Sequence, residues 1–238
     1  MYPFSHKNFN PFLHHPFMQE IKVIAFDYDR VLTDQNLKFD TRLIPYFKDM
    51  INRGILVGIN TGRRWEYINH MLPWVNFIIY ENGYFLFYKE NIPLYSREEE
   101  HMALEIKKRL RENGINCVEG KMMVSCPIDL MGDLENLFLN DSVKLVPNVD
   151  RVFVLPINID KGSALIKFLI MLGLKNSNLC TVGDGENDLD MFLVSGFPAA
   201  IGNSIDQLKR ISRYVSDKSY SDGTIDVIEY LKRIDFKY

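Results

Sequence analysis

A short apolar segment followed at once by two aspartates is the feature that most constrains the fold. Residues 21–33 read IKVIAFDYDRVLT, with apolar side chains up to Phe26 and carboxylates at Asp27 and Asp29. Such a run is expected of a strand buried on both faces of a parallel sheet. In open α/β sheets, ligands bind beyond the carboxyl ends of the strands. The pair is therefore a candidate for chemistry, although an Asp-x-Asp pair alone is equally compatible with a turn or a helix cap.

Strand-like and helix-like segments alternate along much of the chain. A helical apolar spacing over 41–53 precedes a second strand over 55–59, and 77–80 predicts a third strand. The rhythm resumes after Asn158, with strands over 178–182 and 198–201 and helices opening at Lys161 and covering 188–194, 205–213 and 225–234. This alternation predicts right-handed βαβ units and an α/β fold with a doubly wound parallel sheet.

The segment from Tyr84 to Ile157 has the character of a small α/β insertion with its own sheet. It predicts strands over 84–88, 124–126 and 152–155, and helices over 98–112 and 129–140. We therefore expect a core formed by residues 20–83 and 158–238, with residues 84–157 inserted as a second domain. Residues 1–19 are expected to be a poorly ordered extension. Met18 offers a second translation start, so the sequence does not decide whether residues 1–17 are part of the protein.

Composition and charge exclude several classes of partner. A net charge of -3, from 28 basic and 31 acidic residues, gives no footprint for nucleic acid or an anionic membrane. No apolar run approaches the roughly 20 residues of a membrane span. The cysteines, Cys117, Cys126 and Cys180, are odd in number and form no Cys-x-x-Cys, which favours reduced thiols in a cytoplasmic protein. Small metabolites are the favoured partners, and a homodimer remains open.

Polar residues follow other predicted strands. Thr61 and Gly62 come after the second strand, where a hydroxyl and backbone N–H groups can meet an anion. The acidic segment GDGENDLD, residues 183–190, follows the strand over 178–182. The pattern argues against an EF-hand there, because Gly185 would stand at the second position of a loop that begins at Asp184 and the 12-residue loop pattern is absent.

These groups are expected at one edge of one sheet. Carboxylates from two strand ends, Asp27 with Asp29 and Asp184 with Asp188, make an all-oxygen site suited to Mg²⁺. Thr61 and Lys161 are expected to add groups of the opposite polarity. A divalent cation, an ammonium and a hydroxyl together suit a phosphoryl group and its transition-state charge.

In the order of its motifs the chain resembles the haloacid dehalogenase superfamily of phosphatases. The motifs are DYDRVLT, NTGR, Lys161 within DKGSAL, and GDGENDLDMF, with ENG at 81–83, IGN at 201–203 and DGT at 222–224. The resemblance covers about residues 20 to 238. It implies a Rossmann-like core and a C2-type cap over 84–157, as in the archaeal-type phosphoglycolate phosphatases and their relatives acting on sucrose phosphate or mannosyl phosphoglycerate.

The resemblance also implies roles for individual residues. Asp27 is expected to be the nucleophile and a Mg²⁺ ligand, and Asp29 the general acid/base, meeting the metal through its backbone carbonyl. The expected phosphate-binding residues are Thr61, Gly62, Lys161 and Asn187, and the further metal-binding residues are Asp184 and Asp188. Basic residues of the cap that could meet a substrate carboxylate are Arg97, Lys121, Lys144 and Arg151, although surface charge is the simpler interpretation of each.

One position departs from the family pattern. The family usually writes Asp-x-Asp-Gly-Thr, whereas Arg30 stands here where glycine is usual. We therefore expect a backbone that does not require positive φ at this position. The side chain is expected either to point to solvent or to reach over the mouth of the site.

Three functions follow from these residues and from the resemblance. The first is a Mg²⁺-dependent phosphomonoester hydrolase that acts through an aspartyl-phosphate on a small metabolite such as phosphoglycolate or a sugar phosphate. The second is a phosphomutase of the phosphomannomutase type, which would need a sugar bisphosphate. The third is a non-catalytic binding or regulatory protein of the same fold.

Overall fold

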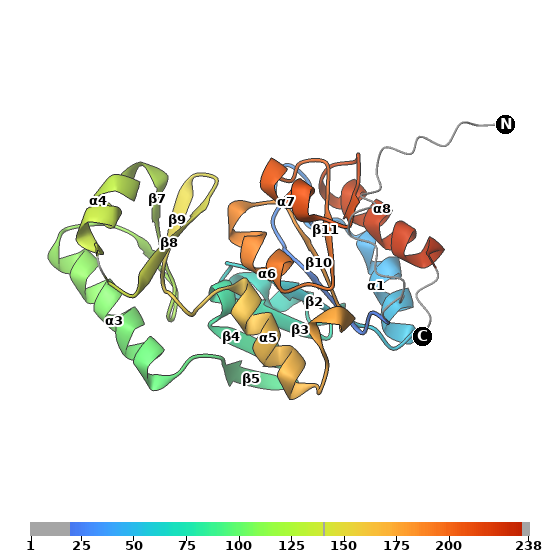
Figure 1. Cartoon of the computed structure of the whole chain (residues 1–238), viewed down its shortest axis with the longest axis horizontal. Helices are drawn as coiled ribbons and strands as arrows, with labels where there is room; N and C mark the ends of the chain where they lie inside the picture. The colour runs from blue at the N-terminus through green and yellow to red at the C-terminus, as the bar shows by residue number, and fades with distance from the viewer. Residues whose placement is uncertain (1–19, 140, 235–238) are drawn as a thin grey trace.

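The structure, a computed structural model, describes residues 20–139 and 141–234 (Figure 1). The extension expected over residues 1–19 lies outside the described residues. Two sheets organise the described chain, one of eight strands and one of four. Within these residues, no helix has both the length and the apolar character needed to cross a bilayer.

The large sheet has the strand order β12-β11-β10-β1-β2-β3-β4-β5. Pairing is parallel from β12 to β3 and antiparallel across β3, β4 and β5. Its strands are β1 (Val23–Phe26), β2 (Leu56–Asn60), β3 (Phe77–Tyr80), β4 (Phe85–Tyr88), β5 (Glu90–Pro93), β10 (Leu179–Gly183), β11 (Phe197–Ala200) and β12 (Tyr214–Val215). The parallel part places the carboxyl ends of its strands at one edge, as the sequence predicts.

Helices cover both faces of this sheet (Figure 1). One face carries α1 (Leu43–Asn52) and α8 (Tyr220–Arg233), and the other carries α5 (Lys161–Met171), α6 (Leu189–Leu193) and α7 (Asp206–Ile211). Along β1, Ile24 and Phe26 pack in the first apolar cluster, and Val23 and Ala25 pack in the second. Since both faces of β1 are buried, its unbroken apolar run is explained, and the doubly wound α/β fold is confirmed.

The second sheet belongs to a compact segment between β5 and α5, here called the inserted unit (residues 97–156). Its antiparallel strand order is β6-β7-β9-β8. The elements are α3 (Arg97–Glu112), β6 (Val118–Glu119), β7 (Val124–Pro127), α4 (Met131–Leu137), β8 (Val143–Asn148) and β9 (Arg151–Pro156). Side chains of α3, α4 and the sheet form a separate apolar core, so the unit stands at one end of the molecule with its own packing (Figure 1).

The sheets differ from the sequence expectation in two respects. The strand expected over 84–88 within the insertion is β4, and it pairs with β3 in the large sheet. The sequence pattern does not predict four further strands, namely β5, β6, β8 and β12. They are very short or carry proline and charged residues, as in ENIP and VKLVPN. Pairing with a neighbour, which a single sequence does not display, is what makes them strands.

The expectation of reduced thiols is wrong for two of the three cysteines. Cys117 and Cys126 form a disulfide, whereas Cys180 is a buried free thiol on β10. In the register of β6 and β7, Val118 lies opposite Ser125, which brings the two flanking cysteines opposite each other. An odd count and the absence of Cys-x-x-Cys carry no information about such a cross-strand pair.

Removing this bridge is expected to loosen the edge of the inserted unit. The disulfide closes a short loop, since its cysteines are 9 positions apart, and such a bridge stabilises by about 2–3 kcal/mol through the unfolded state. Replacing both Cys117 and Cys126 by Ser should lower the free energy of opening β6 and β7 by that amount, measured by amide hydrogen exchange without reductant. With reductant present, wild type and variant should exchange alike. Equal protection without reductant would contradict the bridge.

Candidate active site

A buried lysine ammonium joins two carboxylates at the edge of the large sheet. Asp27 follows β1, Lys161 is the first residue of α5, and Asp188 lies in the turn after β10. The Lys161 Nζ donates to Asp27 Oδ1 at 2.5 Å and to Asp188 Oδ1 at 2.7 Å. Lys161 is 1% exposed. Its burial lowers the pKa, but the carboxylates of Asp188 and Asp27 outweigh this effect and raise the pKa of Lys161, which keeps the ammonium charged.

Asp188 also shapes the loop that follows β10. Its Oδ2 accepts from the backbone N–H groups of Asp184 at 2.8 Å and Gly185 at 3.0 Å. Glycine is required at position 183, because a Cβ there would stand 2.6 Å from the same oxygen. The carboxylate therefore fixes the backbone that presents Asp184.

Asn203 ties this loop to the loop after β1. Its Nδ2 donates to Asp184 Oδ2 at 3.0 Å and to the carbonyl oxygen of Arg30 at 3.2 Å. Its Oδ1 accepts from the N–H of Tyr220 at the start of α8. One amide thus orients an acidic side chain and two loops, a role that the sequence analysis did not assign to this residue.

Three carboxylates gather where a cation would be held. Ligand oxygens of Asp27, Asp184 and Asp188 all lie within 4.8 Å of one another. Burial is the main cause that raises the pKa of Asp27 to about 7, with Asp188 and Asp29 adding to it and Lys161 opposing it. Burial, followed by the charges of Asp188 and Asp27, raises the pKa of Asp184 to about 8. An all-oxygen donor set with surplus negative charge fits a hard divalent cation such as Mg²⁺.

Asp29 lies apart from this cluster and is held by an arginine. Arg63 donates to it in a fork, from Nε to Oδ2 at 2.7 Å and from Nη2 to Oδ1 at 2.9 Å. The guanidinium of Arg63 also lies over the ring of Tyr67, 4.3 Å from its centroid. A bidentate pair fixes both distance and orientation, so the carboxylate of Asp29 is kept at the wall of the site.

Thr61 and Gly62 form the turn after β2. Thr61 is 1% exposed, and its Oγ1 accepts from the N–H of Arg63 at 3.1 Å. A Cβ at Gly62 would stand 2.8 Å from the ring of Phe153, which belongs to the inserted unit. Glycine at this position therefore permits the inserted unit to approach the core closely.

A core carboxylate fastens the inserted unit over the site. Glu81, which is 2% exposed, accepts from the N–H groups of Lys121, Met122 and Met123 at 2.8–2.9 Å. On the other side of this loop, Lys107 donates to the carbonyl oxygens of Gly120 and Lys121. The N–H groups of this loop are therefore bound by Glu81 of the core, and its carbonyl oxygens by Lys107 of the inserted unit. These hydrogen bonds set the position of the inserted unit relative to the core.

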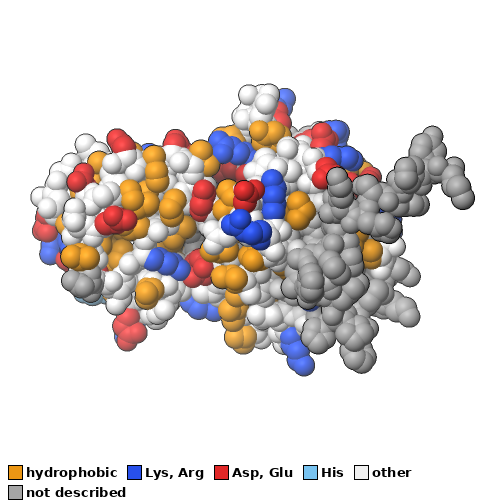
Figure 2. Space-filling model, turned by 45° about the horizontal axis from the view of Figure 1, so that its top comes forward, with side chains coloured by type: hydrophobic (Ala, Val, Ile, Leu, Met, Phe, Trp, Pro, Cys, Tyr) orange, Lys and Arg blue, Asp and Glu red, His pale blue; other side chains and the backbone are white. Residues whose placement is uncertain are grey.

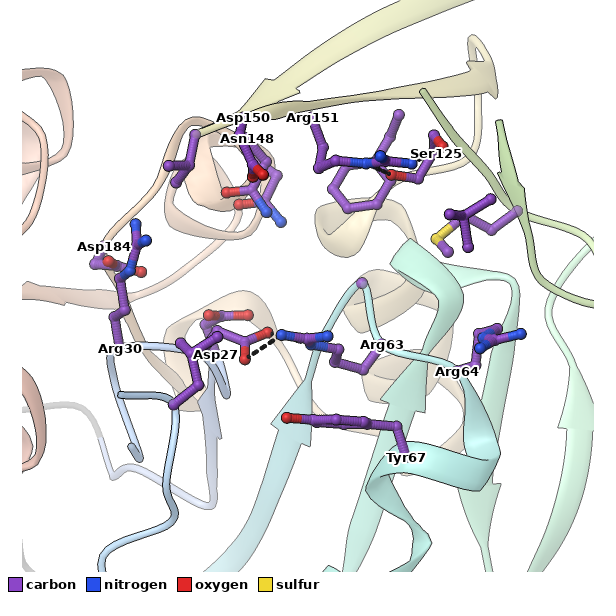
Figure 3. Close-up of a pocket in the computed structure, with 18 residues that line it drawn as sticks. Asp27, Arg30, Arg63, Arg64, Tyr67, Ser125, Asn148, Asp150, Arg151 and Asp184 are labelled. Atoms are coloured by element: carbon purple, nitrogen blue, oxygen red, sulfur yellow. Dashed lines mark hydrogen bonds and ion pairs between the residues drawn. The ribbon is translucent and has the colours of Figure 1, made fainter. Parts of the chain in front are cut away.

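The two units enclose a cavity of about 420 Å³. Acidic and basic side chains gather near the junction of the units (Figure 2). The lining residues come from both units, with the core residues below and those of the inserted unit above (Figure 3). From the core come Asp27, Asp29, Arg30, Leu37, Gly62, Arg63, Arg64, Tyr67, Asp184 and Asn187; from the inserted unit come Val118, Met123, Ser125, Asn148, Val149, Asp150, Arg151 and Phe153.

The structure brings the expected site residues to one place. Four of them are joined by the lysine bridge or by the carboxylate cluster, namely Asp27, Lys161, Asp184 and Asp188. Asp29, Gly62 and Asn187 line the same cavity, and Thr61 lies in its turn, hydrogen-bonded to the backbone of Arg63. The sequence analysis missed Arg63, although it directly follows Thr61-Gly62.

The basic residues expected in the insertion separate into different settings. Arg151 lines the cavity, whereas Arg97 is exposed at the start of α3. Lys144 pairs with Asp160, and Lys121 lies over the ring of Phe85. Surface charge is therefore an incomplete interpretation of Arg151.

The expectation that position 30 does not require positive φ is wrong. Arg30 has a φ of 59°, and its N–H donates to Thr33 Oγ1 at 2.7 Å. A non-glycine residue in this region costs about 1–2 kcal/mol, and this hydrogen bond helps to offset that cost. The side chain lines the cavity beside Asp184, where its charge opposes the raised pKa of that carboxyl (Figure 3).

Comparison with known families identifies the protein class. A family model described as haloacid dehalogenase-like hydrolase matches residues 24–126 and 129–228. The chain belongs to this family. Phosphoglycolate phosphatase 1 of Saccharolobus solfataricus is 23% identical over 223 residues, covering 91% of this chain and 98% of the relative. A phosphoglycolate phosphatase of Methanosarcina acetivorans is 36% identical over 90 residues, which cover 38% of this chain and 40% of that protein.

Solved structures share the fold at low identity. Thermoplasma acidophilum 0175 has a TM-score of 0.76 and 20% identity, over 90% of this chain and 99% of its own. The sucrose-phosphatase of Synechocystis sp. PCC6803 has a TM-score of 0.71 and 14% identity, over 90% and 98%. The family match and the phosphatase relatives confirm the resemblance drawn from the motifs and the expected enzyme class, a phosphatase.

The raised pKa values predict how the stability of this haloacid dehalogenase-like hydrolase depends on pH. The folded-state pKa values of Asp27, about 7, and Asp184, about 8, exceed the ordinary 3.8, so the folded state binds these protons more tightly than the unfolded state. Their contribution to stability is therefore fully present below about pH 4 and is lost progressively as pH rises to about 7 to 8. With EDTA, we expect Tm to fall between about pH 4 and pH 8 and to level off above that range, and Mg²⁺ to raise Tm mainly at the higher pH.

Asp184→Asn isolates the contribution of this cluster. It should reduce the fall in Tm and remove most of the increase that Mg²⁺ gives, while Asp133→Asn, at an exposed position of α4, should behave like wild type. An equal Mg²⁺ effect in wild type and Asp184→Asn would contradict a cation site at these carboxylates.

Proposed function

We propose that the protein is a Mg²⁺-dependent phosphomonoester hydrolase that forms a phosphoryl intermediate on Asp27. The observation that carries this proposal is the placement of Asp27 at the end of β1, bound to Lys161 through Oδ1 and lining the cavity. The other oxygen, Oδ2, is then the atom that attacks phosphorus. Asp27, Asp184 and Asp188 would hold the Mg²⁺, which when bound supplies positive charge against the phosphoryl oxygens.

The chain's own residues can carry the two halves of the reaction. In the first, Asp27 Oδ2 bonds to phosphorus while the ester oxygen departs and takes a proton from Asp29, which must enter this step protonated and turned out of its fork with Arg63. In the second, Asp29 takes a proton from water, whose oxygen attacks phosphorus and releases phosphate from Asp27. Lys161 keeps its charge next to the nucleophile, and the turn of Thr61 and Gly62, with Asn187, would bind the phosphoryl oxygens.

We further propose that the inserted unit acts as a C2-type cap. It supplies about half of the cavity wall and is fastened by Glu81 in a closed position. Closure of this kind excludes water and commits the substrate. The names of the relatives support phosphoglycolate or a similar small phosphorylated acid as substrate, and the sucrose-phosphatase neighbour supports a sugar phosphate as the second class.

Phosphate release from a panel of esters tests this function. The panel holds p-nitrophenyl phosphate, phosphoglycolate, sucrose 6-phosphate, mannosyl phosphoglycerate and hexose phosphates, each with Mg²⁺ and with EDTA. We expect Mg²⁺-dependent release that Asp27→Asn lowers by more than about a thousandfold, because the nucleophile is lost. Asp133→Asn, which removes an exposed carboxylate of the inserted unit, should retain wild-type rates.

Other results would redirect the assignment. Activity that survives in Asp27→Asn would overturn the mechanism. Transfer to sugar that requires a sugar bisphosphate would identify a phosphomutase, and binding of Mg²⁺ without turnover of any ester would favour a non-catalytic protein.

We also propose a cytoplasmic location, because small phosphorylated metabolites are the proposed substrates. The Cys117–Cys126 bridge is the feature that this proposal must accommodate, since disulfides are uncommon in most cytoplasmic proteins. Rapid alkylation of thiols at cell lysis, together with fractionation, gives the location and the state of the bridge. Recovery of the protein outside the cytoplasm would refute the proposal.

A further inference from the structure

An arginine of the inserted unit faces the proposed catalytic residues across the cavity. Arg151, the first residue of β9, lines the cavity across from Asp27 and Arg63 (Figure 3). Its Nε donates to Ser125 Oγ at 3.0 Å, and its Nη2 donates to the carbonyl oxygen of Ser125. Both acceptors are uncharged. They fix the direction of the guanidinium without neutralising its charge.

The other arginines of the cavity are engaged differently. Arg63 is bound in a fork by Asp29, and Arg30 lies beside the acidic cluster, where it acts on the charge of Asp184. Arg64 is exposed and meets the carbonyl oxygen of Glu119 at 3.5 Å. In contrast, none of the ion pairs within 4.0 Å among residues 20–139 and 141–234 includes Arg151.

The free donors of Arg151 suit a planar anion. A guanidinium has five N–H donors, and Ser125 uses two nitrogens of the fork. The remaining donors match the two oxygens of a carboxylate, for which arginine has the right geometry. Because the partly buried side chain is already oriented, binding an anion costs little additional ordering.

The neighbours of Arg151 restrict the kind of anion. Asp150 and Asn148 line the same wall of the cavity. The negative charge of Asp150 opposes a dianion more strongly than a monoanion, so a carboxylate fits this wall better than a second phosphate. The amide of Asn148 can both donate to and accept from a hydroxyl group.

We propose that Arg151, oriented by Ser125, determines specificity by binding a carboxylate at the end of the substrate remote from the reacting phosphate. This inference rests on the proposed function for the position of the phosphate. It narrows the substrate to small phosphorylated acids, with hydroxyl groups accommodated by Asn148 and Asp150, and it disfavours sugar bisphosphates.

A pair of non-hydrolysable ligands tests the inference by calorimetry on the Mg²⁺-loaded protein. 3-Phosphonopropionate carries a carboxylate, and propylphosphonate has a methyl group in its place. Wild type should bind the carboxylate ligand at least about 10-fold more tightly, the value of a charge-assisted hydrogen bond. Arg151→Met should bind the two ligands within about threefold of each other and leave the affinity for propylphosphonate near that of wild type.

Two further variants sharpen the comparison. Arg97→Met makes the same chemical change on the inserted unit outside the cavity and should keep the wild-type preference. Ser125→Ala removes one orienting hydrogen bond and should reduce the preference only about twofold, which leaves it well above that of Arg151→Met. A structural role alone would instead lower both affinities together.

Several results would overturn the proposal: equal binding of both ligands by wild type, binding of neither, or an undiminished preference in Arg151→Met. Hydrolysis of the ester panel by wild type is measured as a separate test of the proposed function. A protein that prefers 3-phosphonopropionate through Arg151 yet hydrolyses no ester would refute the proposed function while upholding the role of Arg151.

Discussion

The structure depends first on the buried ammonium of Lys161 between Asp27 and Asp188. A charge removed from water is tolerated only when it is paired and hydrogen-bonded, and removing one partner from such a group costs about 3–5 kcal/mol. To make these bonds, the end of β1, the start of α5 and the loop after β10 must converge. That convergence fixes where α5 meets the sheet. Because Asp184 adds a third carboxylate beside the single ammonium, the cluster keeps a net negative charge that suits a cation.

The same requirement, that a buried charge be satisfied, sets the second unit in place. Glu81 is buried and finds its donors in the backbone of the inserted unit, not in the core that carries it. Lys107 holds the other side of that loop, and the ring of Phe153 rests where Gly62 lacks a side chain. The two walls of the cavity are therefore positioned by polar contacts with defined geometry as well as by apolar packing. The cavity is lined by side chains that follow strands of the large sheet, such as Asp27, and by side chains of the second sheet, such as Arg151.

Much of the core could be predicted from the sequence, because parallel strands leave little freedom. Once β1 and β10 are recognised by their apolar runs, their carboxyl ends must share an edge, and the acidic residues that follow them must lie close together. The pairing of Arg63 with Asp29 could not be predicted in this way, since it depends on side-chain rotamers. The positive φ of Arg30 could not be predicted either, because it is stabilised by two hydrogen bonds that only the fold brings about. The N–H of Arg30 donates to Thr33 Oγ1, and its carbonyl oxygen accepts from Asn203 Nδ2.

The wall of the cavity that carries Arg151 is harder to predict, because the antiparallel register of the second sheet creates it. Ser125 reaches Arg151 only because β7 and β9 pair with Pro127 opposite Arg151, which sets the two residues diagonally on the sheet. On the other edge of β7, the two-residue strand β6 is held by its ladder and by the Cys117–Cys126 bridge next to Ser125. No motif spacing encodes the contact of Ser125 with Arg151, since the two residues are 26 positions apart. The proposed reacting groups therefore follow from the topology of the large sheet, whereas the proposed specificity residue, Arg151, is placed by the register of a small sheet that only the structure shows.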